Sequence, residues 1–189
     1  TVTGGSDFCG TSRSTDAANA GHGASCSNGN SEAGAVQVPE VVLPSDLATN
    51  NSNSRLSGDD PVGASVWQRG NLQWNPSSRT LTVSYDTLTL MGDLPYDLCR
   101  LVVTGGAELK INTTSEARIF FDTPENCGLS SGADQLIVNS GGRITTNDKV
   151  PGFYFKGTSN ILLYGDAHIT AVIYAPHSDV TLSQGFAYD

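Results

Sequence analysis

The sequence predicts an all-β protein, and three observations support this fold class. Short apolar segments recur between Leu98 and Tyr188, and Gly, Asn, Asp or Ser occupies almost every gap between them. The centres of these segments follow one another about every 17 to 19 residues. Helix-forming residues are scarce, and no long stretch shows the 3.6-residue apolar period of an amphipathic helix.

The regular spacing favours a β-solenoid, a β-helix-like body in which each turn lays two or three short strands on the turn below. A single turn cannot bury its inward side chains, whereas several stacked turns share one continuous core. A sandwich of short strands with regular turns is the alternative. Two series of apolar centres carry the interpretation: Val102, Ile119, Leu136, Phe153 and Val172, and Ile144, Ile161 and Val180.

Two regions of different composition predict two domains. Residues 1–65 form a segment of loops rich in Gly, Ser and Asn, and residues 66–189 form the solenoid domain. Residues 1–35 contain too few apolar side chains to build a core of their own. Residues 36–44 alternate briefly between apolar and polar types but contain Pro39 and Pro44, so they predict an edge strand or an extended strap.

The ordered body begins near residue 66. Strict alternation in Thr80–Tyr85 predicts a strand with Leu81, Val83 and Tyr85 on one face, and Thr87–Leu90 predicts the next strand. The strands expected after residue 98 are Leu101–Val103, Leu109–Ile111, Ile119–Phe121, Leu136–Val138, a segment at Ile144, Phe153–Phe155, Ile161–Leu163, Ile169–Tyr174 and Val180–Leu182.

Two tryptophans, Trp67 and Trp74, flank a predicted turn at Gly70-Asn71. An exposed aromatic pair at this spacing could stack on a sugar ring. The interpretation that we favour is burial, with both rings covering the open end of the solenoid core.

Four cysteines fall into two pairs along the chain. We expect disulfides Cys9–Cys26, closing a loop rich in Gly and Ser, and Cys99–Cys127, enclosing about one and a half turns of the stack. Four cysteines allow three pairings, and pairing of neighbours is the choice made here. Disulfides indicate an oxidising compartment, so we expect an extracellular or cell-surface location.

Asn50 and Asn112 begin N-glycosylation sequons.

Net charge argues against one class of partner. Nineteen acidic and ten basic residues give a formal charge of −9, and the basic residues are scattered along the chain. A polyanion such as nucleic acid would be repelled on average. No run of apolar residues is long enough to span a membrane.

No motif indicates catalysis convincingly. His177-Ser178-Asp179 are adjacent in sequence, and neighbours on an extended strand point to opposite faces. Gly128-Leu129-Ser130-Ser131-Gly132 has the letters of a nucleophile elbow without its strand-and-helix context. His22 lies between glycines and has no evident metal ligands around it. We therefore expect no enzymatic activity, no cofactor and no metal. The carboxylates considered for a glycosidase groove, which show no common register, are Asp122, Glu125, Asp134, Asp148, Asp166 and Asp179.

Three segments carry a resemblance to a known family. Thr87–Leu101, with its Thr-Leu-Thr-Leu strand, Gly corner, Tyr96 and Cys99, resembles the entry into the C-terminal β-solenoid domain of PilX-like minor pilins. Pro124–Gly128 is similar to that family's second cysteine segment, and Ile173–Leu182 to its Tyr-Ala-Pro-Asn turn, with His177 in place of Asn. The resemblance covers roughly residues 80–189, and similar segments occur in a broad group of surface and pilus-associated solenoids.

The resemblance implies a structural or adhesive module of a type IV pilus-like filament or surface appendage. Pilins carry a hydrophobic N-terminal helix that these 189 residues lack. The chain is therefore a truncated form, a proteolysed head or a subunit whose partner is a separate helix-bearing pilin chain. Other pilus subunits and surface glycans are the expected partners, with Phe186 and Tyr188 at a subunit or strap contact. The alternative function is a carbohydrate-binding or carbohydrate-active solenoid protein.

Overall fold

The structure is a computed structural model that describes residues 38–56, 71–91, 95–112, 117–147, 149–183 and 187–188. The chain divides into two compact units, residues 1–39 and residues 40–189. Nearly all described residues belong to the second unit. It contains all the described strands and also the segment from Glu40 to Leu56, which the sequence grouped with the N-terminal loops.

The second unit is built from short strands, which confirms the all-β prediction. In the described residues the only helix is a 3₁₀ turn, η2 (Asn53–Leu56), and no helix is long and apolar enough to cross a membrane. The strands are β1 (Leu72–Asn75), β2 (Thr80–Ser84), β3 (Thr87–Leu90), β4 (Tyr96–Leu98), β5 (Arg100–Thr104), β6 (Glu108–Ile111), β7 (Arg118–Phe121), β8 (Asp134–Val138), β9 (Arg143–Thr146), β10 (Gly152–Phe155), β11 (Asn160–Leu163), β12 (His168–Ile169), β13 (Val172–Tyr174), β14 (Asp179–Leu182) and β15 (Ala187–Tyr188).

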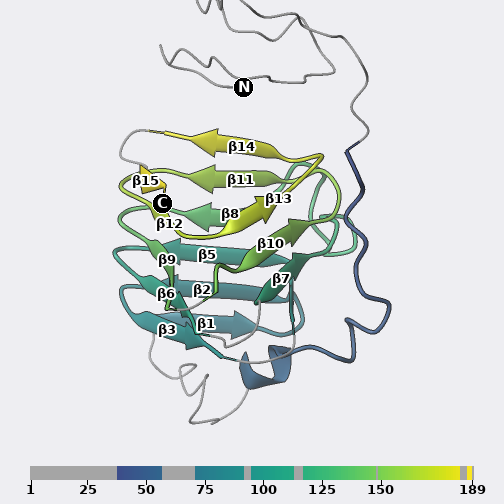
Figure 1. The fold of residues 1–189 in the computed structure, drawn as a ribbon, viewed down its shortest axis with the longest axis horizontal. Coiled ribbons are helices and arrows are strands. Elements are labelled where there is room, and N and C mark those ends of the chain that lie inside the picture. The colour runs from purple at the N-terminus through teal and green to yellow at the C-terminus, as the bar shows by residue number, and fades with distance from the viewer. Residues whose placement is uncertain are drawn as a thin grey trace, which may run out of the picture. The chain divides into compact units, whose positions relative to one another are not determined.

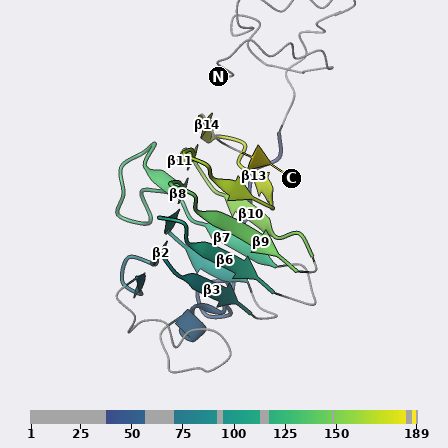
Figure 2. The ribbon, with the colours of Figure 1, turned by 90° about the vertical axis from the view of Figure 1, so that its left-hand side faces the viewer.

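These strands form three sheets that the chain visits in rotation. Sheet A has the order β1-β2-β5-β8-β11-β14, sheet B the order β15-β12-β9-β6-β3, and sheet C the order β13-β10-β7-β4. Each strand from β2 to β12 pairs in parallel with the strand three places later, and among the described strands only the β1–β2 pair is antiparallel. Figure 1 shows the successive strands of sheet A stacked one above another, and Figure 2 shows β3, β6 and β9 stacked in the same way.

Each level of the stack has its own length. Leu81, Leu101, Leu136, Ile161 and Val180 occupy one register position in sheet A, which gives steps of 20, 35, 25 and 19 residues. The predicted series from Val102 to Val172 is therefore wrong, because it joins residues of different sheets; of the second series, Ile161 and Val180 do share a register position, whereas Ile144 lies in sheet B. Val102 pairs with Ile137 in sheet A, whereas Ile119 and Phe153 pair in sheet C. The corners vary in length while the strands keep their register, and the loop between β7 and β8 alone adds a dozen residues.

The core lies between the three sheets. Inward residues such as Leu101, Leu109 and Ile119 come from sheets A, B and C respectively and are fully buried. Phe121 of β7 stacks on Phe155 of β10 with ring centroids 4.2 Å apart, and its centroid lies 6.2 Å from that of Phe153. Large side chains from successive levels thus fill the interior without a gap between levels.

Residues 40–56 form a strap that ends in η2, and the described part of the predicted segment, residues 38–44, contains no strand. Val41 and Leu47 are buried, and the Ser52 N–H donates to the Pro95 carbonyl at 2.8 Å. Near the other end of the stack, His177 Nε2 lies 2.8 Å from Glu40 Oε1. The strap therefore contacts both the β13–β14 corner and the entry to β4, and Figure 1 shows it passing along one side of the strands.

Two local predictions are wrong. Tyr85 does not share the buried face of Leu81 and Val83, because β2 ends at Ser84 and a positive φ of 55° turns the ring outward, where the residue is 75% exposed. The expected strand Ile169–Tyr174 is two strands, β12 and β13, separated by a corner at Thr170-Ala171. In both cases the chain passes to another sheet at a point where the apolar pattern of the sequence continues.

Replacing Phe121 tests the shared core. Phe121→Ala should lower the free energy of unfolding by about 3–5 kcal/mol, because the ring contacts two aromatic rings of the next level and its loss leaves a cavity. Urea denaturation followed by near-UV circular dichroism would measure the change. Val42→Ala, at a side chain that is 81% exposed, is the control and should stay within about 0.5 kcal/mol. Equal effects of the two substitutions would contradict this packing.

Candidate functional site

One group of bonded polar side chains lies where the β1–β2 turn meets the corners at which the chain passes from sheet C to sheet A. Arg79 follows a turn in which Asn75 Oδ1 accepts hydrogen bonds from the backbone of Ser77 and Ser78 at 3.0 and 3.1 Å. Its backbone takes a positive φ of 46°, and its carbonyl accepts a hydrogen bond from the Cys99 N–H at 2.9 Å. The turn thus delivers an arginine side chain to the edge of β4.

Arg79 lies between two carboxylates. Its Nη1 donates to both carboxylate oxygens of Asp97, and its Nη2 lies 3.3 Å from Asp122 Oδ2. Asp97 belongs to β4 and is only 5% exposed, and Asp122 follows β7 directly. A single guanidinium therefore pairs with acids from two successive levels, and we call these three residues the Arg79 cluster. A buried charge of this kind is tolerated when it is paired and hydrogen-bonded.

The two carboxyl groups of the Arg79 cluster respond oppositely to their surroundings. Burial raises the pKa of Asp97 above the usual aspartate value; the hydrogen bond and charge of Arg79 oppose the rise, and the charge of Asp122 adds to it. Burial would also raise the pKa of Asp122. Hydrogen bonds from the Thr123 N–H, Asn126 and Arg79, with the charge of Arg79, outweigh burial and hold that pKa below the usual value.

The Cys99–Cys127 disulfide lies against this cluster and confirms one of the two predicted pairings. Cys99 lies between β4 and β5 and Cys127 between β7 and β8, so the bond joins the same corner of two successive levels. Cys127 Sγ is 3.7 Å from Arg79 Nη2. The enclosed segment contains β5, β6 and β7, one strand from each sheet, and so spans about one turn; the expected one and a half turns was wrong.

A buried glutamine links the same two corners through the backbone. Gln135 is fully buried, and its Nε2 donates to the Cys99 carbonyl at 3.0 Å and to the Asp122 carbonyl at 2.8 Å. One side-chain amide thus bonds to the backbone of both corners. The corner is therefore held by a covalent bond, an ion cluster and a side-chain amide together.

The strap binds to the edge of β4 through Asn53. Asn53 Nδ2 donates to the Asp97 carbonyl at 2.6 Å, and the Asp97 N–H donates to Asn53 Oδ1 at 3.1 Å. Asn51 Oδ1 accepts the Asn53 N–H at 2.9 Å, and Asn51 Nδ2 donates to the Leu47 carbonyl at 2.6 Å. An asparagine side chain thus takes the hydrogen bonds that a neighbouring strand would make with β4.

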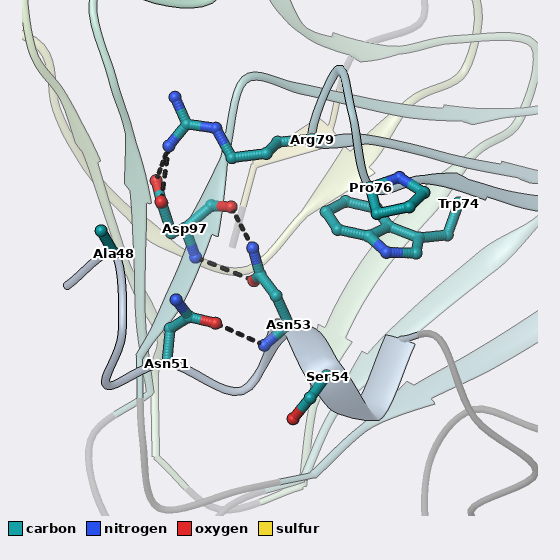
Figure 3. Close-up of a pocket in the computed structure, with 8 residues that line it drawn as sticks. All are labelled: Ala48, Asn51, Asn53, Ser54, Trp74, Pro76, Arg79 and Asp97. Atoms are coloured by element: carbon teal, nitrogen blue, oxygen red, sulfur yellow. Dashed lines mark hydrogen bonds and ion pairs between the residues drawn. The ribbon is translucent and has the colours of Figure 1, made fainter.

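A hollow of about 290 Å³ lies between this part of the strap and the β1–β2 hairpin, and Figure 3 shows the side chains around it. Trp74 is half-buried against the core and presents part of its ring here beside Pro76. The amides and charged groups in the hollow are already bonded to one another or to the backbone. Chemically, the hollow offers an aromatic surface with few uncommitted polar groups. It is lined by Ala48, Asn51, Asn53, Ser54, Trp74, Pro76, Arg79 and Asp97.

Residues considered for catalysis do not converge in the described part of the chain. His177 pairs with Glu40, and the Ser178 hydroxyl lies 2.7 Å from the Ser159 hydroxyl, so His177, Ser178 and Asp179 form no relay. The segment 128–132 is a loop that leads into β8 without the helix of a nucleophile elbow. Among the described residues no group of three or more His, Cys, Asp or Glu side chains could hold a metal ion.

The other predicted site residues are only partly described. Asn50 is exposed, and its Nδ2 donates to Asp46 Oδ2 at 2.9 Å. The Asn112 N–H donates to the Leu90 carbonyl at 3.0 Å, but the rest of its sequon is outside the described residues. Tyr188 lies in β15, which pairs with β12. Cys9, His22, Cys26, Trp67, Asp148 and Phe186 fall outside the described residues.

Sequence reasoning missed the Arg79 cluster. Arg79 and Asp97 are 18 residues apart, and Arg79 and Asp122 are 43 apart, so no local sequence motif predicts that these three residues meet. Only the turn signal at Asn75–Ser78 and the cysteines near both acids point to this corner.

Comparisons of the chain with protein-family models, with curated proteins and with solved structures found no match. The candidate site is therefore defined by its geometry alone.

Acid titration should separate the two carboxylates of the cluster. A carboxyl group with a lowered folded pKa contributes stability above its unfolded pKa and loses it as the pH falls through the folded value. On acidification through the aspartate range, Asp122→Asn should therefore lose less melting temperature than wild type, because it lacks this pH-dependent stabilisation. Asp97→Asn should lose more than wild type, because a raised pKa adds stability as the pH falls.

Differential scanning calorimetry across that pH range measures both effects. Asp166→Asn is the control, since Asp166 is exposed and takes a positive φ of 60° that asparagine also tolerates. Parallel acid profiles for Asp122→Asn and wild type would show that the Asp122 contacts do not favour the ionised form.

Proposed function

We propose that this chain is a structural or adhesive module of an extracellular appendage and that residues 40–189 form a β-solenoid. One observation carries the proposal. Each strand from β2 to β12 pairs in parallel with the strand three places later, and inward residues of the middle levels such as Leu101, Leu136 and Ile161 are fully buried. Contacts of that kind connect each level mainly to its neighbours, which produces a stiff body whose length grows with the number of levels.

Contacts outside the strand pairing support a structural role, because they also hold successive levels together. The Cys99–Cys127 bond and the Arg79 cluster tie the β4–β5 corner to the β7–β8 corner. The strap is anchored at both ends of its described part, by Glu40 to His177 and by Asn53 to β4. A force along the stack would have to break these contacts as well as the strand pairing.

The chemistry of the described side chains favours a structural role over catalysis. Both carboxylates of the Arg79 cluster are hydrogen-bonded to the arginine, and that of Asp122 also accepts the Thr123 N–H, so these groups already have protein partners in place of a substrate. His177, on the β13–β14 corner, is bonded to the strap. A structural role requires only these satisfied contacts.

The disulfide supports an oxidising location, because such bonds persist mainly outside the cytosol. The resemblance of residues 80–189 to PilX-like minor pilins makes a type IV pilus-like filament the specific setting that we propose. Other pilus subunits, with a separate helix-bearing pilin chain among them, would then be the partners.

A carbohydrate-binding or carbohydrate-active solenoid is the second candidate, and Trp74 is the observation that favours it. Its half-buried ring borders the hollow and could stack on a sugar. Because the surrounding amides are committed to the strap and to β4, recognition would depend mainly on ring stacking. Binding to a glycan array that Trp74→Ala abolishes without unfolding the chain would favour this candidate.

Locating the protein on its source cells tests the structural proposal. Immunogold electron microscopy with antibodies against residues 40–189 should label filaments or the outer surface of intact cells. Alkylation of the same cells before lysis should leave Cys99 and Cys127 unmodified, because they are bonded to each other. Label confined to the cell interior, with both cysteines alkylated, would refute the extracellular role.

A further inference from the structure

Sheet A ends at β14 with its inward face open. Val180 and Leu182 occupy the register positions of Ile161 and Leu163, which are 0% and 2% exposed one level below. At β14 these positions are 41% and 54% exposed. The two side chains therefore point where a core would continue, but lie largely in solvent. Figure 1 shows β14 as the last strand of this sheet.

The other end of the same sheet is closed. Leu81 and Val83 of β2 are at most 1% exposed, because β1 continues the sheet and the turn η2 adds to the core. Leu72 of β1 and Leu56 of η2 are themselves members of the core cluster. The protein thus seals one end with its own residues, and none of the described residues seals the other in the same way.

The backbone of β14 is open as well. β14 pairs with β11 on one side, and in the described residues no strand pairs with its other side. An edge of unpaired N–H and C=O groups next to exposed apolar side chains invites pairing with another strand.

We propose that a second copy of this chain covers this end, with the two β14 strands paired antiparallel about a two-fold axis perpendicular to sheet A. The inference names a partner for the structural role proposed above and rests on it. Rotation about such an axis keeps each side chain on its own face of the sheet. Val180 and Leu182 of both copies therefore remain inward, and the two cores join end to end. Closed two-fold contacts of this kind are the commonest among homo-oligomers.

The sequence of β14 is complementary to itself in one antiparallel register. Val180 lies opposite Leu182 of the second copy, and Thr181 lies opposite its own equivalent on the outer face. Asp179 then lies opposite Ser183 of the second copy, which separates the two carboxylates. A parallel in-register pair would oppose the two Asp179 side chains, and directly opposed like charges destabilise a sheet. Apolar pairs inside and a Thr–Thr pair outside both favour the antiparallel arrangement.

Sedimentation velocity of residues 1–189 at increasing concentration tests the contact. Wild type should change from monomer to dimer, and Leu182→Lys should weaken the dimer about tenfold or more by placing a charge in the joined core. Val150→Lys is the matched control, since Val150 is 47% exposed and lies away from β14, and it should dimerise as wild type does. A dimer unaffected by Leu182→Lys would contradict the proposed surface.

Cross-linking tests the register. Under mild oxidation Thr181→Cys should form a symmetric intermolecular disulfide, identified by mass spectrometry of the linked peptide, whereas Asp179→Cys should not. A dimer that links through position 179 and not 181 would overturn the register. A wild-type chain that stays monomeric and shows slow hydrogen exchange in β14 would overturn the proposal, because its own residues would then cover the edge. Either failure would leave labelling on the cell surface unchanged, so it would be distinguishable from failure of the structural role.

Discussion

Parallel pairing between successive levels is the constraint on which the rest of the structure depends. Each strand is only two to five residues long and could not hold its inward side chains away from water alone. Pairing at fixed register places Leu136 over Leu101 and Ile161 over Leu136, so each level supports the next one along the chain. The stability of any level therefore derives from its neighbours, and the first and last levels are the ones that need other covering.

The Arg79 cluster lies at corners where the stacking of levels interrupts the strand pairing. Where the chain leaves sheet C for sheet A, backbone groups lose their strand partners, and Asp97 is buried there with a raised pKa. A hydrophobic residue at this place would avoid the cost of burying a carboxylate. It could not, however, pair with Arg79, which also reaches Asp122 one level away. The ion cluster therefore contributes mainly to the alignment of the two corners. Its contribution to net stability is secondary.

The sequence was sufficient for the fold class and for most strands, because inward alternation and Gly- or Asn-rich corners are local signals. It failed where three-dimensional context decides. Tyr85 continues an alternating pattern, yet its positive φ ends the strand, and its ring lies over Gly105, where an added Cβ would come within 2.5 Å of it. Level lengths were misjudged because the corners, unlike the strands, have no period. The local disulfide Cys99–Cys127 could be guessed, whereas Arg79, Asp97 and Asp122 meet only after two levels have stacked.

The two ends of sheet A show how the same constraint leads from fold to function. At β1 the chain reverses into a hairpin, and Leu56 and Leu72 close the core within the molecule. At β14 the register simply continues to Val180 and Leu182, with more than two fifths of each residue exposed. A protein that only had to fold could end both sides alike, for example with charged or bulged edge strands. Among the described residues an apolar edge is present at one end of sheet A and absent at the other, and this asymmetry is the reason for proposing that β14 is a surface for assembly.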